Sequence, residues 1–371
     1  MPKPRITFLC PTMTQPRFIK RVEAAISVGF SVQVLAFERG YYNDNKFPSE
    51  ADVVCLGQLK DGNYLNRALS IPRYRRQIAR KLDQFQPDAC YSFGTDNLFL
   101  FRTLRKKIHY LVHEVGDLRV TNKIAFWQRK ILGTLEKKLL NTADQIVVTS
   151  NAFSNHFEKL YNISLDKFSV LENKLSSKLI ELKERKPSIS FSGPIRIGVI
   201  GLLRYDTIFD LIDVVRDLPK SCTLDFWGDG PLKARLISTI QDASNIEYHG
   251  SYVYPDALPQ IYSQTDLSFV VYDNSDINVR LALPNKLYES AYYGIPIIVA
   301  TNTELNNQVA EKKIGFAVSP GDVVELKNII TSLEKKDLQN IQEHAISNLE
   351  LNDLVDGSKN FFLNLSTKIL N

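Results

Sequence analysis

Short apolar runs rich in β-branched and aromatic residues alternate with longer segments of helical periodicity along most of the chain. Each run has the length of a strand, and each longer segment has the length of a helix. The runs are 6–10, 31–37, 88–93, 108–114 and 145–150 in the first half, and 195–201, 224–228, 246–250, 267–272 and 295–301 in the second. Because strands that alternate with helices build parallel sheets, the pattern predicts an α/β fold.

The length of the chain and one break in this pattern predict two domains. With 371 residues, the chain exceeds the size at which a single hydrophobic core usually keeps growing. Residues 181–194 combine charge with proline, serine and glycine and show little periodicity, as a linker does. We therefore predict two Rossmann-like, doubly wound domains over 1–180 and 195–350. Residues 351–371 are expected to form a C-terminal helix, for which packing back on the first domain is one option.

The composition is that of a soluble globular protein, with 44% hydrophobic and 23% charged residues. The four cysteines lie far apart and show no spacing suited to zinc, so they are expected to be reduced thiols of a cytosolic protein. No apolar run reaches the roughly 18 residues of a membrane-spanning helix, and the N-terminal run is too short for a signal peptide. These features predict a cytoplasmic location.

Basic side chains cluster at two places in the N-terminal half, and a third segment mixes them with aromatic residues. The segments are Arg73, Arg75, Arg76, Arg80 and Lys81; Arg102, Arg105, Lys106 and Lys107; and Phe126, Trp127, Arg129 and Lys130. Such a mixture suits an anionic partner, and peripheral docking on the inner face of a membrane is one interpretation. A solvated helix face and an ordinary core are the alternatives. No nucleic-acid motif accompanies the charge, so a nucleic acid is not an expected partner.

Two loops of the second half follow buried strands and carry glycine. Gly201 comes directly after a buried strand, with Arg204 three residues later, and Gly228 lies in the segment WGDGP. Ligands of open α/β sheets bind at such strand ends. Glycine lets a ligand approach the backbone, and arginine can bind phosphate oxygens in a bidentate way. Each loop by itself is equally compatible with an ordinary turn.

The segment 283–301, LPNKLYESAYYGIPIIVAT, predicts a turn, a short helix and a buried strand. Lys286 and Glu289 lie one turn apart on the helix, and Gly294 is expected to end it. The start of the helix would direct free N–H groups at a phosphate, and Lys286 would add a full positive charge. Glu289 could accept hydrogen bonds from ribose hydroxyls. A surface Lys–Glu pair is the alternative.

The order of these motifs resembles that of the GT-B glycosyltransferases, particularly the bacterial family 4 and group 1 enzymes of polysaccharide biosynthesis. The resemblance rests on Gly201 to Arg204, WGDGP at 227–231, YHGSYVYPDALPQIYSQTDLSFVVYD at 248–273, PNKLYE at 284–289 and YGIPIIVAT at 293–301. It covers about 195–320 well and the N-terminal half only loosely. It implies the GT-B fold, in which two Rossmann-like domains face a cleft.

The resemblance also implies where a nucleotide sugar binds. The base is expected near residues 250–253, the ribose at Glu289, and the diphosphate at Arg204 and Lys286. The predicted donor-binding residues are Gly201, Arg204, Gly228, Gly250, Tyr252, Val253, Asn285, Lys286 and Glu289.

The sequence departs from the family pattern at two positions. The lysine that usually follows the arginine is absent from residues 205–210, so Lys286 is expected to bear more of the phosphate charge. The E-x7-E motif keeps only Glu289, because its first position is Leu281. This second departure leaves the retaining stereochemistry of family 4 open.

The remaining predicted site residues are expected to act in catalysis or in binding of the sugars. His113, Glu114 and Asp117 follow a predicted strand, and a carboxylate or histidine there could be the catalytic base, with Asp117 favoured over His113. Turn or capping roles are the alternative. Arg17 and Arg21 lie in the first loop, where the family contacts the acceptor and the donor sugar. Arg280 could contact an acidic donor sugar, and solvent exposure is its alternative.

The function implied by the resemblance is a metal-independent glycosyl transfer. The donor would be a nucleotide sugar, with a UDP-sugar favoured, and the acceptor a glycan or lipid-linked glycan of cell-surface polysaccharide. No cofactor and no metal are expected, since the sequence holds no Asp-x-Asp motif and basic side chains can offset the charge of the leaving group. The alternatives are a donor-binding GT-B-like protein without activity and a nucleotide-sugar epimerase.

Overall fold

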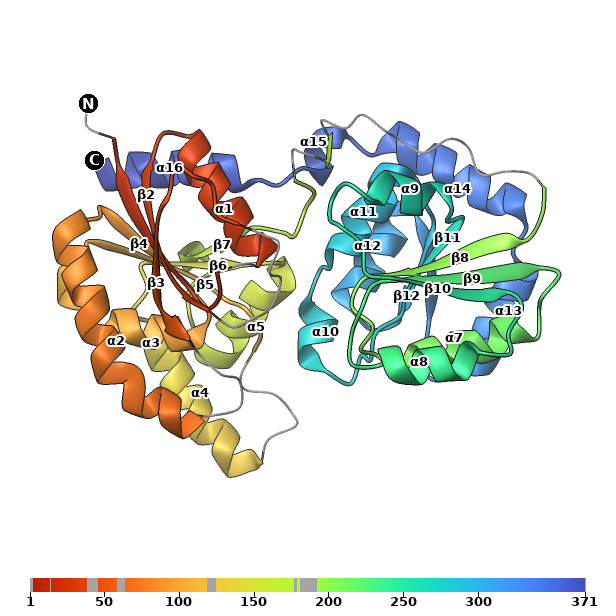
Figure 1. Ribbon diagram of the computed structural model, residues 1–371, viewed down its shortest axis with the longest axis horizontal. Helices are drawn as coiled ribbons and strands as arrows, with labels where there is room; N and C mark the ends of the chain where they lie inside the picture. The colour runs from red at the N-terminus through yellow and green to blue at the C-terminus, as the bar shows by residue number, and fades with distance from the viewer. Residues whose placement is uncertain are drawn as a thin grey trace. The chain divides into compact units, whose positions relative to one another are not determined.

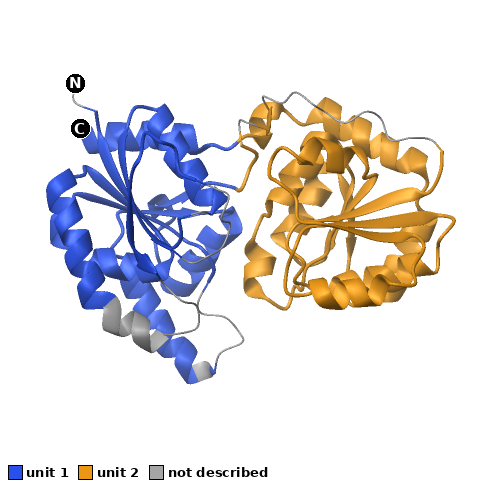
Figure 2. Cartoon of the chain, in the orientation of Figure 1, with its two compact units in different colours: residues 1–172, 356–371 blue, residues 173–355 orange. Residues whose placement is uncertain are grey.

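The computed structural model describes residues 3–13, 15–38, 46–58, 64–118, 125–176, 179–180 and 192–370. Side chains are described for the same residues except 64–70 and Phe126. The chain forms two compact units, of which unit 1 comprises residues 1–172 and 356–371 and unit 2 comprises residues 173–355 (Figure 2). Each unit contains its own sheet, so each is described by itself.

Unit 1 is built on a parallel sheet whose described strands have the order β3-β2-β1-β4-β5-β6-β7. The strands are β1 (Arg5–Cys10), β2 (Ser31–Glu38), β3 (Asp52–Gln58), β4 (Ala89–Phe93), β5 (Tyr110–Glu114), β6 (Gln145–Val148) and β7 (Phe168–Val170). The helices are α1 (Pro16–Ser27), α2 (Tyr64–Phe85), α3 (Thr95–Thr103), α4 (Phe126–Leu140), α5 (Asn151–Tyr161) and α16 (Ser358–Leu370), with 3-10 turns at Arg105–Lys107 and Leu165–Lys167. Helices α1 and α16 pack side by side (Figure 1).

Unit 2 is built on a second parallel sheet, with the strand order β10-β9-β8-β11-β12-β13. The strands are β8 (Ile195–Ile200), β9 (Cys222–Trp227), β10 (Ile246–Gly250), β11 (Leu267–Val270), β12 (Ile297–Ala300) and β13 (Gly315–Val318). The helices are α7 (Thr207–Arg216), α8 (Lys233–Ile240), α9 (Leu258–Ser263), α10 (Ile277–Leu281), α11 (Asn285–Tyr293), α12 (Glu304–Lys312), α13 (Val323–Ser332), α14 (Lys335–Asn348) and α15 (Leu351–Leu354). The predicted α/β class with two doubly wound parallel sheets is confirmed.

Each face of the second sheet carries its own hydrophobic core. One core joins the sheet to α7, α8 and α13, and the other joins it to α9, α11 and α12. The direction of strand addition reverses between β8 and β11, which are neighbours in the sheet. A reversal of this kind leaves a crevice at the carboxyl ends of the two strands, where open α/β sheets bind ligands. A ligand-binding site is therefore expected at the loops that follow β8 and β11.

The boundary between the units differs from the predicted one. The division falls after Glu172, eight residues before the predicted end of the first domain. Leu175 and Leu179 are buried in the core of unit 2, and the backbone N–H of Leu175 donates to the carbonyl of Leu354 at 2.9 Å. Apolar burial thus assigns this segment to unit 2. Of the predicted linker 181–194, only residues 192–194 are described.

The C-terminal segment is two helices rather than one. The chain leaves α15 at Leu354, crosses to unit 1 at Asp356, and begins α16 at Ser358. Phe361, Phe362 and Leu365 of α16 are buried in the core of unit 1. Among the described helices, none is both long enough and apolar enough to cross a membrane.

Candidate donor-binding site

Glycine residues allow the carboxyl ends of β8, β9 and β10 to lie against one another. The N–H of Gly201 donates to the carbonyl of Trp227, and the N–H of Gly228 donates to the carbonyl of Gly250, each at 2.7 Å. Gly201, Gly228 and Gly250 have φ angles of +122°, +139° and +83°, a region that side chains rarely allow. These three predicted glycines therefore lie together at one edge of the sheet.

Lys286 is a buried cation beside the first of these glycines. A Cβ built on Gly201 would lie 3.4 Å from Cε of Lys286. The lysine is 4% exposed, and its Nζ lies 2.5 Å from Oε2 of Glu289 and 3.4 Å from the hydroxyl of Tyr252. Burial by itself lowers the pKa of Lys286, but the Glu289 carboxylate together with Tyr252 and Tyr262 outweighs it, so the pKa is raised above its ordinary value. Lys286 is consequently protonated.

Glu289 is enclosed by hydrogen-bond donors from three residues. Nδ2 of Asn285 donates to Oε1 at 2.5 Å, while the hydroxyl of Tyr262 donates to Oε2 at 3.0 Å. The third donor is Lys286. The Glu289 side chain is 0% exposed, so in this structure its carboxylate holds the lysine and does not face solvent. A contact with ribose hydroxyls stays a prediction that needs this carboxylate to be uncovered.

Helix α11 presents Asn285 and Lys286 in its first turn. It begins after Pro284 and ends at Gly294, whose φ of +65° provides the left-handed cap predicted from the sequence. Lys286 lies in the first turn of this nine-residue helix, and its Cε would be 3.4 Å from a Cβ built on Gly201. Two kinds of positive charge therefore coincide there, that of the ammonium group and that of the helix dipole.

Arg204 is exposed, and it lies on an aromatic pair that sequence reasoning did not identify. Its Nη2 donates to the hydroxyl of Tyr205 at 2.5 Å, and its guanidinium carbon is 4.7 Å from the centre of that ring. Tyr205 in turn stacks on Tyr272, with ring centres 4.5 Å apart. Tyr272 is the second residue after β11, so the stack joins the two loops at which the strand order reverses.

The other predicted residues of unit 2 lie farther along these loops. Val253 is 69% exposed, whereas Tyr252 is half-buried against Lys286. Arg280 is half-buried near the end of the short helix α10. The structure thus brings Gly201, Tyr252 and Lys286 into contact and places Val253 at the surface.

His113 is the first of three candidate catalytic bases in unit 1. It lies on β5, is 1% exposed, and its Nδ1 is 2.9 Å from the hydroxyl of Ser92. Burial lowers the pKa of His113 to about 3, although the hydrogen bond with Ser92 acts in the opposite direction. The imidazole is therefore neutral at pH 7 and is enclosed by the sheet.

Glu114 belongs to a buried ionic network rather than to a surface. Its carboxylate accepts from Nε and Nη2 of Arg21, at 3.1 and 3.4 Å, and from the hydroxyl of Tyr91 at 2.5 Å. Arg21 also donates to Asp356 at 2.9 Å and to Ser358 at 2.5 Å. Arg21 and Glu114 are 0% and 1% exposed.

This burial counts against the roles predicted for Glu114 and Arg21. A base or a sugar-binding residue must reach its substrate, and both side chains are used within the core. Asp117 is exposed in the loop after β5, and Arg17 is half-buried in the first turn of α1. Because β1 and β5 are parallel to β4, their carboxyl ends share one edge of the sheet. Asp117 and Arg17 are the predicted residues left at that edge.

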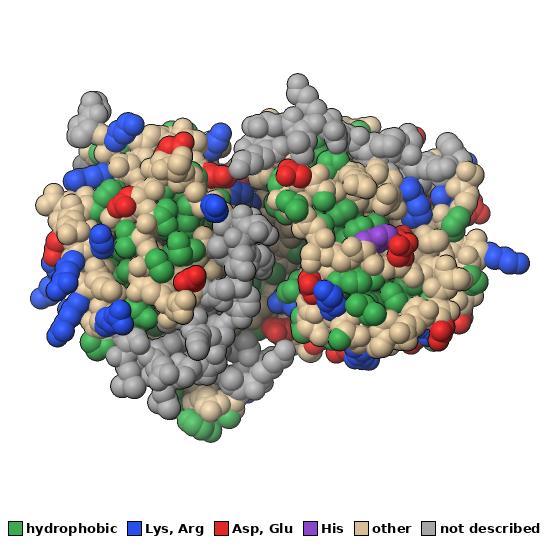
Figure 3. Space-filling view, viewed as in Figure 1, with side chains coloured by type: hydrophobic (Ala, Val, Ile, Leu, Met, Phe, Trp, Pro, Cys, Tyr) green, Lys and Arg blue, Asp and Glu red, His purple; other side chains and the backbone are tan. Residues whose placement is uncertain are grey.

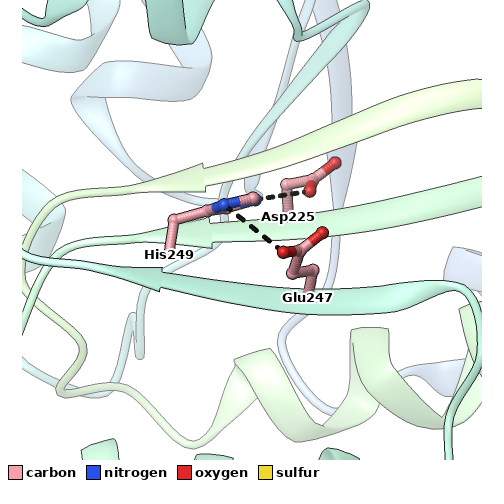
Figure 4. Close-up of side chains that lie close together, drawn as sticks. All are labelled: Asp225, Glu247 and His249. Carbon is pink, nitrogen blue, oxygen red and sulfur yellow. Dashed lines mark hydrogen bonds and ion pairs between the residues drawn. The ribbon is translucent and has the colours of Figure 1, made fainter.

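A group of potential metal ligands lies on β9 and β10, where Asp225, Glu247 and His249 face one another (Figure 4). Nε2 of His249 is 2.7 Å from Asp225, and Nδ1 is 3.9 Å from Glu247. The imidazole stacks on Trp227 at 4.7 Å. Asp225 is a hydrogen-bond partner of Nε2, and Glu247 lies beyond hydrogen-bond distance of Nδ1, so one hydrogen bond joins members of the group. It is the one such group among the residues that the structure describes.

The predicted basic clusters of unit 1 are only partly free. Arg105 donates to both carboxylate oxygens of Asp144, at 2.7 and 2.8 Å, and Lys107 pairs with Asp83 at 2.6 Å. Among the described side chains of α2, the exposed basic ones are Arg73, Arg75, Arg76 and Arg80. Figure 3 shows Lys and Arg side chains gathered at the left edge of unit 1, where Figure 1 places α2.

Helix α4 carries an apolar stripe on its outer face. Trp127, Ile131 and Leu135 recur every fourth residue and are 63%, 55% and 48% exposed, and Leu132 beside them is 40% exposed. Exposed lysines flank the stripe at Lys130 and at 137–138. The alternative that Trp127 is an ordinary core residue is therefore wrong. The side chain of Phe126 lies outside the described residues.

Two family models match the chain, one for each sheet. The family described as "Glycosyltransferase Family 4" matches residues 22–174, and the family described as "Glycosyl transferases group 1" matches residues 194–336. Together the two matches cover most of the chain.

Individual proteins are similar over nearly the whole length. The succinoglycan biosynthesis protein ExoL of Rhizobium meliloti (strain 1021) is 23% identical over 356 residues, which are 89% of this chain and 84% of that protein. Sucrose-phosphate synthase from Thermosynechococcus elongatus has a TM-score of 0.73 at 14% identity, with 99% of each chain covered. HepE from Anabaena, in complex with UDP-glucose, has a TM-score of 0.70 at 16% identity, with 98% of this chain and 99% of that chain covered. At these identities, the two solved structures show a shared fold.

Proposed function

Since the chain belongs to the GT-B glycosyltransferases of the group 1 and family 4 type, we propose that it transfers a sugar from a nucleoside diphosphate donor to a glycan or lipid-linked glycan. A UDP-sugar is the favoured donor, because the similar protein HepE has been solved with UDP-glucose. The relative ExoL is a succinoglycan biosynthesis protein, which favours cell-surface polysaccharide as the product. The observation that carries the proposal is Lys286, a buried and protonated lysine beside Gly201.

The proposed mechanism uses positive charge of the chain to offset the charge of the leaving diphosphate. Arg204, Lys286 and the start of α11 supply that charge at one end of the sheet of unit 2. Fixed charges of this kind act most strongly as negative charge develops in the transition state. This arrangement supports a metal-independent transfer that needs no cofactor. Asp117, which is exposed at the end of β5, is the proposed base that accepts the proton of the acceptor hydroxyl.

A thermal-shift panel tests the donor site directly. UDP-, GDP-, ADP- and dTDP-sugars are added to the wild type, to Arg204→Ala, and to Arg235→Ala as the matched control. Arg235 also lies over an aromatic ring, that of Phe209 at 3.8 Å, and it pairs with Asp206 in the loop of Arg204 at 2.6 Å, so its removal controls for a general disturbance of that loop. A ligand present at 100 times its Kd stabilises the folded state by about 2.7 kcal/mol. We expect a shift with UDP-sugars that Arg204→Ala reduces and Arg235→Ala retains; no shift with any nucleotide sugar would refute the donor site.

Product analysis separates the transferase from the two alternatives. A transferase forms a new glycosidic bond to an added glycan acceptor, and loss of one charge-stabilising group should lower kcat about 100- to 1000-fold. An epimerase would instead return a nucleotide sugar of altered configuration. A binding protein without activity would show the thermal shift but neither product, and the loss of the first glutamate at Leu281 is the feature that keeps this alternative in consideration.

The stripe on α4 supports a peripheral location at an anionic membrane. Exposed tryptophan and aliphatic side chains flanked by lysine are the mixture that binds to a lipid interface. Sedimentation with vesicles containing phosphatidylglycerol tests this, with Trp127→Ser/Ile131→Ser as the variant. Val324→Ser is the control, since Val324 is 70% exposed on unit 2. Wild-type protein that stays in the supernatant, or a variant that sediments equally well, would exclude this use of the stripe.

A further inference from the structure

The two loops that meet at the reversal of strand order are tied together by two contacts. The hydroxyl of Thr207, at the start of α7, donates to the carbonyl of Val271 at 2.5 Å. Next to this bond, the ring of Tyr205 stacks on that of Tyr272 with an interplanar angle of 24°. The loop after β8 is thus anchored to the loop after β11 by the hydroxyl of Thr207 and by the ring of Tyr205.

Arg204 extends this stack by one more layer. Its guanidinium lies over Tyr205, and one of its nitrogens, Nη2, donates to the phenol oxygen. An exposed arginine on a loop normally samples many rotamers, and fixing it on binding a ligand costs free energy. A guanidinium that already rests on an aromatic face loses less freedom when it binds phosphate.

The stack lies in the loop where this chain lacks the lysine of the family pattern. No lysine occurs in residues 205–210, and Tyr205 occupies the position directly after the arginine. Burial raises the pKa of Tyr272 to about 12, although the nearby Lys286 acts in the opposite direction. Tyr272 is therefore a neutral phenol at pH 7, and it brings no competing negative charge to the cations around it.

We infer that Tyr205, held by its stack on Tyr272, is a positioning residue that orients Arg204 toward the diphosphate of the donor. This inference rests on the proposed function, because it needs a nucleoside diphosphate at this end of the sheet. Tyr205 acts through Arg204, whose remaining N–H groups bind oxygens of the phosphates. Its contribution should therefore depend on how many phosphates the ligand carries.

Calorimetric titration with UDP and with UMP tests this dependence. The variants are Arg204→Ala, Tyr205→Leu, which removes both the ring and the hydroxyl, and Tyr205→Phe, which keeps the ring. Arg235→Ala is again the control. We expect Tyr205→Leu to weaken UDP binding about tenfold and UMP binding less than about twofold. Arg204→Ala should show the same preference, with a larger loss of UDP affinity. Tyr205→Phe should recover most of the lost affinity, since it can still stack on Tyr272.

The outcomes separate the inference from the proposed function. A preference of the wild type for UDP that Arg204→Ala abolishes and Tyr205→Leu retains would overturn the positioning role alone. Equal losses for UDP and UMP in Tyr205→Leu would also overturn it, because they indicate a general loss of structure. A wild type that binds neither nucleotide would refute the UDP site itself, and the inference with it.

Discussion

Gly228 and Gly201 approach so closely that a Cβ on Gly228 would lie 1.8 Å from the carbonyl oxygen of Gly201. No rearrangement of a side chain can relieve this contact, because the opposing atom belongs to the backbone. The two residues end neighbouring strands, β9 and β8, and their loops carry the donor site. Glycine at 228 is therefore a requirement of the backbone rather than of the ligand.

The first prediction concerns this contact. Gly228→Ala should lower the free energy of unfolding by more than about 2 kcal/mol, because it adds a backbone clash to an unfavourable φ of +139°. Urea denaturation measures the change. Gly116→Ala is the control, since a Cβ at Gly116 meets no atom within 4 Å. Equal stability of the two variants would show that the loops separate readily.

The second prediction concerns the buried pair of unit 2. Lys286→Met should destabilise the protein by about 3–5 kcal/mol, because it leaves the Glu289 carboxylate buried without its cation. The double variant Lys286→Met/Glu289→Gln should regain part of this loss. Lys327→Met, which breaks an exposed pair with Asp217, should cost less than about 1 kcal/mol in the same urea titration. A double variant less stable than Lys286→Met would contradict the argument.

The third prediction concerns pH and His113. Its pKa is about 3 in the folded protein and about 6.5 when unfolded, so the unfolded chain binds more protons between these values. Stability should therefore fall as the pH drops below 6.5, by up to about 1.4 kcal/mol per pH unit. Denaturation at pH 7, 6 and 5 should show a smaller slope for His113→Asn. His109→Asn, at an exposed position, should keep the wild-type slope.

The fourth prediction concerns the link between Arg21 and Asp356. Burial alone raises the pKa of Asp356, but Arg21 and Lys20 lower it overall to about 2. The stabilisation is thus complete above the unfolded value of 3.8 and is lost as the pH falls toward 2. Asp356→Asn should remove about 2 kcal/mol at pH 7. Asp353→Asn, a change at an exposed carboxylate on α15, should have little effect, and a similar loss in both would exclude the ion pair as the cause.

The sequence predicts the buried strands better than the edge strands, for a physical reason. Central strands such as β1 and β12 are covered on both faces and are continuous apolar runs. The alternation of apolar runs with helical segments in the sequence did not predict β3, β7 and β13, each of which lies at the edge of a sheet. An edge strand is short or partly exposed, so its residues include polar ones, as the pattern of β3 shows. Such a strand is harder to recognise before its neighbour is known, although the run 246–250 did predict the edge strand β10.

The contacts of the candidate site also include some that the sequence predicts and others that it does not. The pairing of Lys286 with Glu289 follows from their spacing on one helix and could be predicted. The burial of Glu114 could not, because its environment depends on Arg21 and, through it, on Asp356 at the far end of the chain. The Tyr205–Tyr272 stack likewise joins two loops that only the order of the strands brings together.

The crossing of the chain at Asp356 has a consequence for synthesis on the ribosome. Helix α16 supplies Phe361, Phe362 and Leu365 to the core of unit 1, but it is translated only after all of unit 2. Domains generally fold in the order in which they emerge. Here the unit whose strands emerge first cannot complete its core until α16 follows, whereas unit 2 is a single continuous segment. The second unit can therefore finish folding first, while a nascent unit 1 still exposes the surface around Phe8 and Tyr91 that Phe362 will cover.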